Sequence, residues 1–211
     1  MSNDERPTQS QFEAYDGMFQ WFSRTLFGGE LRPVILNFSR RAKTLGFFAP
    51  ERWQRAKGKG TTHEISLNPA FLKTRPTRDT ASTLVHEMTH LWQFEAGTPS
   101  RGGYHNAEWA DKMESIGLMP SDTGQPGGKR VGPRMTHYIV DGGPFDRAFK
   151  QMPAGYLLPW QSWEPTDPAK GKGAPVSKLK YTCPDCATNV WGKPGLNLCC
   201  LDCKTALKPA A

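Results

Sequence analysis

The 211-residue sequence lacks three features, and each absence excludes a class of protein. No stretch approaches the roughly twenty apolar residues of a membrane-spanning helix, which argues against a membrane partner. No apolar segment follows the polar N-terminus, so a secretory signal is not expected. All five cysteines lie beyond residue 180, where an odd, clustered set favours metal binding over disulfides. We therefore expect a cytoplasmic protein.

Acidic residues are in the minority, with 20 Asp and Glu against 27 Lys and Arg and a net charge of +7. Such a balance suits a polyanionic partner such as nucleic acid, but it also suits solubility alone. The apolar share of 37% is adequate for a globular core. Length and composition do not indicate an oligomeric state.

Apolar periodicity predicts helices and a small sheet in the first 120 residues. Helical spacing or alternation predicts elements in this order: a helix over 12–26, strands over 34–38 and 63–67, and helices over 77–96 and 106–116. Glycine and proline then crowd the chain. We therefore divide it into a core over 1–120, an irregular extension and linker over 121–176, and a small domain over 177–211.

The segment His86-Glu87-Met88-Thr89-His90 is an H-E-x-x-H motif inside a helical pattern. Two histidines at positions i and i+4 lie on one helix face and can bind one zinc ion. Glu87 lies one step around the helix, where its carboxylate can act as general base toward water that the ion has made more acidic. The motif predicts peptide hydrolysis without a covalent intermediate. The competing interpretation is a helix whose histidines only pack.

A third zinc ligand is open to two interpretations. The metzincin pattern would place Gly at position 93 and His at position 96, where this sequence has Gln93 and Ala96. A thermolysin-like site would take Glu108 from the following helix. His105, at the end of a glycine-rich loop, is the other candidate.

The segments 84–90 and 105–113 resemble the SprT-like metallopeptidase family, in which a second motif after HExxH carries a third zinc-binding histidine. The resemblance implies His86, His90 and His105 as ligands of a catalytic zinc and Glu87 as the catalytic residue. It also implies an α+β fold with a helical zincin-type core and small sheet, a C-terminal zinc ribbon, and proteolysis of proteins held on DNA. Asn106 stands where the family usually has Gly. Since asparagine tolerates a left-handed backbone, we expect the turn to survive.

Four of the five cysteines form two C-x-x-C pairs separated by thirteen residues. Two such pairs can complete a tetrahedral, structural zinc site, here Cys183, Cys186, Cys200 and Cys203. Cys199 is expected to be a free or packed thiol. The sequence thus predicts two zinc ions, one catalytic and one structural.

Seven lysines and only two acidic residues occur over 168–211, and Trp191 could stack on a base. This predicts non-specific DNA binding, with a solvated linker and a core tryptophan as the alternative. A rival function for the whole chain is therefore a non-enzymatic, transcription-associated protein that binds nucleic acid. His137 is a candidate for a role at the active site.

Overall fold

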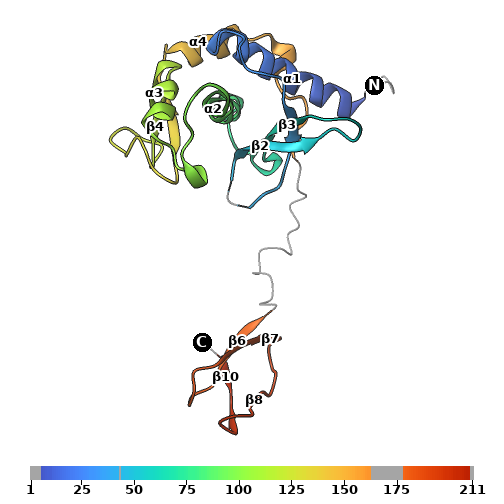
Figure 1. Ribbon diagram of the computed structural model, residues 1–211, viewed down its shortest axis with the longest axis vertical. Coiled ribbons are helices and arrows are strands. Elements are labelled where there is room, and N and C mark those ends of the chain that lie inside the picture. The colour runs from blue at the N-terminus through green and yellow to red at the C-terminus, as the bar shows by residue number, and fades with distance from the viewer. Residues whose placement is uncertain (1–5, 43, 163–177, 210–211) are drawn as a thin grey trace. The chain divides into compact units, whose positions relative to one another are not determined.

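The computed structural model describes residues 6–42, 44–162 and 178–209. The chain divides into two compact units, Met1–Trp163 and Glu164–Ala211 (Figure 1). Within the described ranges, no helix has the length and apolar character needed to cross a membrane.

The described residues of the first unit include four α-helices, and α2 lies at its centre (Figure 1). Their bounds are α1 Pro7–Leu26, α2 Thr77–Ala96, α3 Ala107–Ser115 and α4 Pro144–Gln151, with short 3-10 turns η1 Pro69–Phe71, η2 Arg101–Gly103 and η3 Ala154–Tyr156. The three helices predicted from periodicity correspond to α1, α2 and α3. Pro76 occupies the N-cap of α2 and makes no side-chain capping bond.

A three-stranded sheet lies beside α2, in the order β1-β3-β2. The strands are β1 Ile35–Phe38, β2 Gly46–Gln54 and β3 Thr61–Leu67. The central strand β3 pairs in parallel with β1 and antiparallel with β2. Strands β1 and β3 were predicted, but β2 was not, because Pro50 and the charged residues after it interrupt the alternation.

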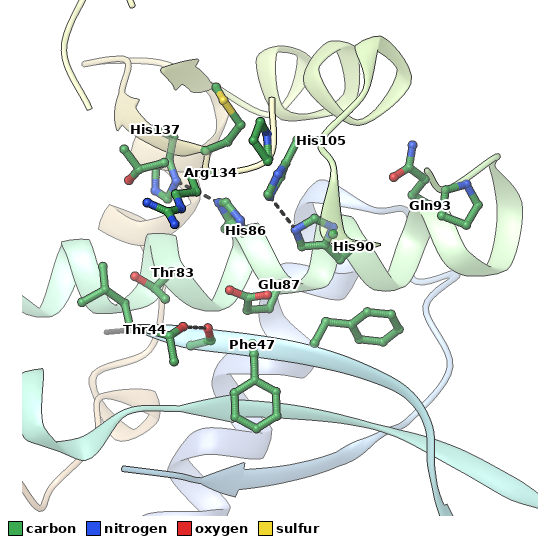
Figure 2. A pocket seen from close by; sticks show the side chains of 18 of the residues that line it. Thr44, Phe47, Thr83, His86, Glu87, His90, Gln93, His105, Arg134 and His137 are labelled. Atoms are coloured by element: carbon green, nitrogen blue, oxygen red, sulfur yellow. Dashed lines mark hydrogen bonds between the residues drawn. The ribbon is translucent and has the colours of Figure 1, made fainter. Parts of the chain in front are cut away.

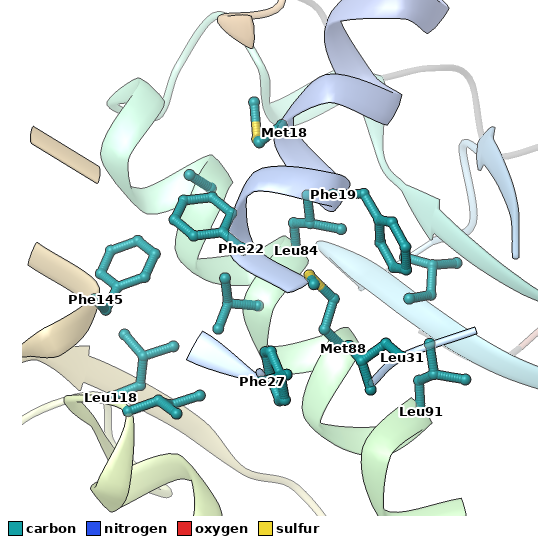
Figure 3. Close-up of a cluster of buried hydrophobic side chains, with 14 of the residues drawn as sticks. Met18, Phe19, Phe22, Phe27, Leu31, Leu84, Met88, Leu91, Leu118 and Phe145 are labelled. Atoms are coloured by element: carbon teal, nitrogen blue, oxygen red, sulfur yellow. The ribbon is translucent and has the colours of Figure 1, made fainter. Parts of the chain in front are cut away.

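The core of the first unit forms where α1 and α2 pack together (Figure 3). Five side chains at this contact are essentially inaccessible to solvent: Phe19 and Phe22 from α1, and Leu84, Met88 and Leu91 from α2. Residues 80–89 of α2 are all buried, so this stretch of the helix is packed against neighbouring segments all around.

The structure differs from the expectation of an irregular chain after residue 120. Strand β4 (Leu118–Ser121) pairs with β5 (Thr136–Ile139), so the strand pairing extends across that boundary. Helix α4 then contributes Phe145, which stacks on Phe22 at 5.5 Å between ring centroids. Glycine and proline here mark the turns and the helix start at Pro144 rather than irregular structure.

The described part of the second unit, 178–209, is built from short strands. These are β6 Leu179–Thr182, β7 Asn189–Gly192, β8 Cys199–Cys200, β9 Thr205–Ala206 and β10 Lys208–Pro209. Strand β6 pairs with β7 and β10, and β8 pairs with β9. Tyr181 and Leu207 form a small core together with Cys183 and Cys200. The α+β class, with several small sheets, is confirmed.

Candidate metal centre

Helix α2 places His86, Glu87 and His90 at the wall of a pocket (Figure 2). The spacing of four residues brings the two imidazoles to one helix face, with ring centroids 5.1 Å apart. The sides of α2 not facing the pocket are packed in the core, which fixes where these side chains can point. The side chains of His86 and Glu87 are buried, and that of His90 is partly buried.

His105 approaches the same face from the segment that precedes α3. Its backbone makes a two-bond bridge with Gly132, with N···O distances of 2.9 and 3.0 Å in the two directions. Its ring Nδ1 lies 3.1 Å from the Gly132 carbonyl oxygen and donates to it. Nε2 is therefore left without a proton and lies 3.0 Å from Nε2 of His90.

Together the three histidines form a group whose ligand nitrogens all lie within 4.8 Å of one another. Three nitrogens at this separation suit a tetrahedral zinc ion, for which Zn–N bonds of about 2.0–2.1 Å put neighbouring nitrogens about 3.3 Å apart. The donor set and its spacing therefore fit zinc.

Trp109 of α3 forms a fully buried wall behind this group. Its ring lies 4.4 Å from His105, 4.9 Å from His86 and 5.4 Å from His90, measured between ring centroids. One rigid side chain thus restricts the orientation of all three imidazoles.

Burial keeps the histidines neutral, which is the form that binds metals. It lowers the pKa of His90 to about 3, with a smaller contribution from His105. The pKa values of His86 and His105 are also lowered, mainly by burial. Burial acts in the opposite sense on an acid and raises the pKa of Glu87 to about 8, partly offset by a hydrogen bond from the backbone of Phe48.

Glu108 lies outside the histidine group and has a different set of contacts. Its Oε2 accepts hydrogen bonds of 2.7 Å from the Gln93 side chain and from the Thr98 backbone. These bonds tie the loop after α2 to the start of α3. The geometry therefore favours His105 over Glu108 as the third ligand.

Asn106 does not adopt the left-handed backbone expected of it, since its φ is −88°. It is the N-cap of α3, and its side-chain oxygen accepts from the backbone N–H of Trp109 at 3.1 Å. The same oxygen accepts from Gln93 at 2.7 Å. The expectation was wrong because asparagine caps helices at least as readily as it forms left-handed turns.

The pocket has a volume of about 780 Å³ and opens between α2 and two surrounding segments. Phe47 of β2 lines one side, Arg134 and His137 line the other, and Phe48 also contributes to the lining. His137 was a weak candidate in the sequence. The structure places it against His86, with 3.3 Å between their Nδ1 atoms, and its Nε2 lies 2.9 Å from Ser82 Oγ.

The second unit contains the other candidate site. The sulfur atoms of Cys183, Cys186, Cys200 and Cys203 all lie within 4.8 Å of one another. Cys186 and Cys200 are 3.7 Å apart, close to the S···S distance of about 3.8 Å that Zn–S bonds of about 2.3 Å impose. Four thiols in this arrangement fit a closed zinc site. Cys199 lies outside the group and is exposed.

Comparisons with known proteins bear on these sites. The profile of the SprT-like family matches residues 15–137. The chain is 31% identical over 104 residues to the DNA-dependent metalloprotease SPRTN of Bos taurus and 30% identical over 103 residues to that of Homo sapiens. The match to the protein of Xenopus tropicalis is 29% over 99 residues.

These alignments cover 49% of this chain against the bovine protein and 48% against the human one, but only 20% of either relative. The chain thus matches about a fifth of the length of these metalloproteases. The family profile covers more than half of the chain and includes the α2 histidines, His105 and His137. This chain belongs to the SprT-like family.

Proposed function

We propose that this chain is a zinc-dependent endopeptidase, with zinc held by His86, His90 and His105. The observation that carries the proposal is the group of three neutral imidazoles in a pocket beside the carboxyl group of Glu87. The chain's membership of the SprT-like family, and its similarity to metalloproteases, support the same reaction.

Zinc in this position would supply Lewis-acid chemistry, polarising the scissile carbonyl and acidifying water. Glu87 would take the proton from the attacking water and deliver it to the leaving amine. Burial alone raises the pKa of Glu87 to about 8, and a dication held beside it would lower that pKa and favour the ionised form that accepts the proton. The aromatic side of the pocket, formed by Phe47 and Phe48, would pack against the substrate chain.

The four cysteines of the second unit would hold a structural zinc. A closed set of four thiolates leaves no position for a substrate, so this ion would stabilise the fold and take no part in hydrolysis. Because the unit has only a small apolar core, zinc would supply much of its folding free energy.

We further propose that the substrates are proteins associated with DNA. Five exposed lysines lie in the described part of the second unit: Lys178, Lys180, Lys193, Lys204 and Lys208. Trp191 is 61% exposed and available for stacking on a base. Lys170 and Lys172, which belong to the same basic stretch of the sequence, lie outside the described residues. The relatives are DNA-dependent enzymes by name.

The physical advantage of such an arrangement is tethering. A unit bound to DNA raises the effective concentration of nearby proteins at the active site, without a tight peptide pocket. Phosphate contacts supply affinity that does not depend on sequence and that weakens as salt rises.

The test is cleavage of casein and of a DNA-binding protein by the full chain, with and without DNA and with and without a zinc chelator. We expect cleavage that the chelator abolishes and that DNA increases for the DNA-bound substrate. Glutamine in place of the five lysines should remove the increase and leave casein cleavage unchanged. Absence of chelator-sensitive cleavage under all conditions would instead favour the non-enzymatic nucleic-acid-binding alternative.

A further inference from the structure

His137 lies within hydrogen-bonding distance of His86, a member of the three-histidine group. It lies on β5, far from α2 in the sequence, and its ring contacts two α2 side chains one turn apart (Figure 2). Its Nδ1 lies 3.3 Å from His86 Nδ1, and its Nε2 lies 2.9 Å from Ser82 Oγ. His137 is not among the residues of the three-histidine group.

The position of each proton follows from the hydroxyl of Ser82. That hydroxyl lies 2.9 Å from the Asp79 backbone carbonyl, and when it donates there its oxygen accepts from His137 Nε2–H. A neutral imidazole carries one N–H, which leaves His137 Nδ1 as an acceptor. His86 Nδ1 must then be the donor, and the remaining lone pair of His86 is on Nε2.

We propose that His137 is a positioning residue that holds His86 as its Nδ1–H tautomer, with Nε2 directed to the metal. This inference rests on the zinc site proposed above. His105 is oriented in the same way by a backbone carbonyl, that of Gly132, at 3.1 Å. Such partners of metal-bound histidines typically contribute about 10- to 100-fold to metal affinity.

The test measures zinc affinity of the full chain by competition with a chelator. His137→Ala should weaken the histidine site by about 10- to 100-fold and leave the cysteine site unchanged as an internal control. His137→Asn should recover part of the loss, because its side-chain oxygen can accept from His86 Nδ1–H. Tyr138→Ala, on the opposite face of β5, controls for damage to the strand and should leave both affinities unchanged.

Equal zinc affinity of wild type and His137→Ala would overturn this inference alone; a loss of cleavage in that variant would then assign the residue to substrate binding. A wild-type chain that binds no zinc at the histidine site would overturn the proposed function as well. An equal loss of affinity in His137→Asn and His137→Ala would also count against a hydrogen-bonding role.

A separate observation concerns the far end of β2. All ten residues from 51 to 60 are exposed, and they include four cations and one acid. Among the described residues, none of Arg52, Arg55, Lys57 and Lys59 pairs with a carboxylate. The loop is closed by Arg55 N–H donating to the Gly60 carbonyl at 3.1 Å. Residues 51–60 therefore form a basic arm.

Trp53 gives this arm an aromatic surface. Its ring is 43% exposed, and its indole N–H donates to Glu64 at 2.7 Å, which restrains the ring. The same strand lines the metal pocket through Phe47, Phe48 and Pro50. At about 3.3 Å per strand residue, Arg52 lies within about 7 Å of the pocket lining along the strand.

We propose that the basic arm binds a single strand of nucleic acid, with cations on phosphates and Trp53 stacked on a base. Unpaired cations beside a restrained, exposed aromatic ring match the chemistry of such strands. This surface is distinct from the lysines of the second unit. It would hold a nucleic-acid strand at the entrance to the pocket.

The test uses the full chain and a fluorescent oligothymidylate, with binding measured by anisotropy over a range of salt. Glutamine at Arg52, Arg55, Lys57 and Lys59 should weaken binding at least tenfold. The slope of log affinity against log salt should become shallower by about 0.7 for each phosphate that the variant no longer neutralises. Trp53→Ala should weaken binding about tenfold.

A matched control removes the same charge from elsewhere in the first unit, with glutamine at Arg6, Arg24, Lys73 and Lys129. This variant should bind nearly as tightly as wild type. Equal binding by the basic-arm variant and the control would overturn the proposal. Weaker binding to duplex but not to the single strand would also overturn it.

Discussion

Trp109 shows how one residue can organise a site without taking part in its chemistry. It contacts all three histidines, which come from two different segments of the chain. Its backbone N–H is fixed by the Asn106 cap. Restricting the rotamers of three ligands in advance lowers the entropy that zinc binding would otherwise cost.

The role of Glu87 can be isolated by removing only its ability to accept a proton. Glu87→Gln preserves the shape of the buried side chain and all three histidines, so the chain should still bind zinc at the histidine site. Peptide cleavage should fall by about 10²- to 10⁴-fold, the usual contribution of a general base. Metal content and the rate of casein cleavage, measured on the same preparation, check this outcome. Undiminished cleavage would show that another group accepts the proton.

His105 and Glu108 provide a matched pair for identifying the third ligand. His105→Ala should lose the zinc of the histidine site, because two ligands do not hold the ion. Glu108→Ala should keep it and loosen the loop after α2, since it loses the bonds to Gln93 and Thr98. Elemental analysis of both variants is decisive, and the reverse result would support the thermolysin-like arrangement.

At the scale of elements, α2 is the part of the fold that connects stability to function. One face packs against α1 in the core, and the other carries the histidine pair. Strand β2 runs close to both β3 and α2. A Cβ added at Gly46 would lie 2.9 Å from the Ser66 carbonyl oxygen of β3 and 3.2 Å from the Thr83 side chain of α2. This close approach brings the backbone of Phe48 to the carboxyl group of Glu87.

The packing of η3 against α1 can be tested at Gly17. A Cβ at this position would lie 2.2 Å from the ring of Tyr156, so the two side chains cannot coexist without movement. Alanine is otherwise favoured over glycine inside a helix by about 1 kcal/mol. Gly17→Ala should therefore destabilise the protein by about 1–3 kcal/mol in the native background.

The same change should stabilise a Tyr156→Ala variant, by about 1 kcal/mol, because the clash is gone. Denaturant unfolding of wild type, the two single variants and the double variant is followed by tryptophan fluorescence. The four free energies of unfolding give the coupling free energy between positions 17 and 156. Stabilisation by Gly17→Ala in both backgrounds would contradict the described contact between α1 and η3.

At the scale of the whole molecule, the two units contain two chemically different groups that could each hold a metal ion. On a four-coordinate zinc ion, three histidines would leave one position open, whereas four thiols would fill every position. Each group lies wholly within one compact unit. Loss of one ion should therefore leave the other site intact.

We expect two zinc ions per chain in purified protein. His86→Ala should retain one ion, Cys183→Ser should retain one, and the double variant should retain none. Only Cys183→Ser should unfold the second unit, because that unit depends on its ion more than on its core. Elemental analysis checks the stoichiometry. A single ion in wild-type protein would remove one of the two site assignments.

Periodicity in the sequence was sufficient to predict α1, α2, α3, β1 and β3, since these patterns depend only on neighbouring residues. The same locality explains why β2 and β5 were missed. In β2, exposed charged residues follow Pro50, and in the chain after residue 120, glycine and proline hide the short strands and α4. Those elements are stabilised by contacts with distant segments, which no local pattern records.

The candidate sites divide in the same way. The pair His86 and His90, and each C-x-x-C pair, followed from spacing alone, because helix and turn geometry places such residues together. The approach of His105 depended on its bridge to Gly132, and that of His137 on the pairing of β5 with β4. Bringing either histidine to α2 closes a loop of the chain, and this closure costs conformational entropy. Only the packing of the tertiary structure compensates that cost. The sequence by itself therefore determined which chemistry is present, and the tertiary structure decided which residues complete and orient it.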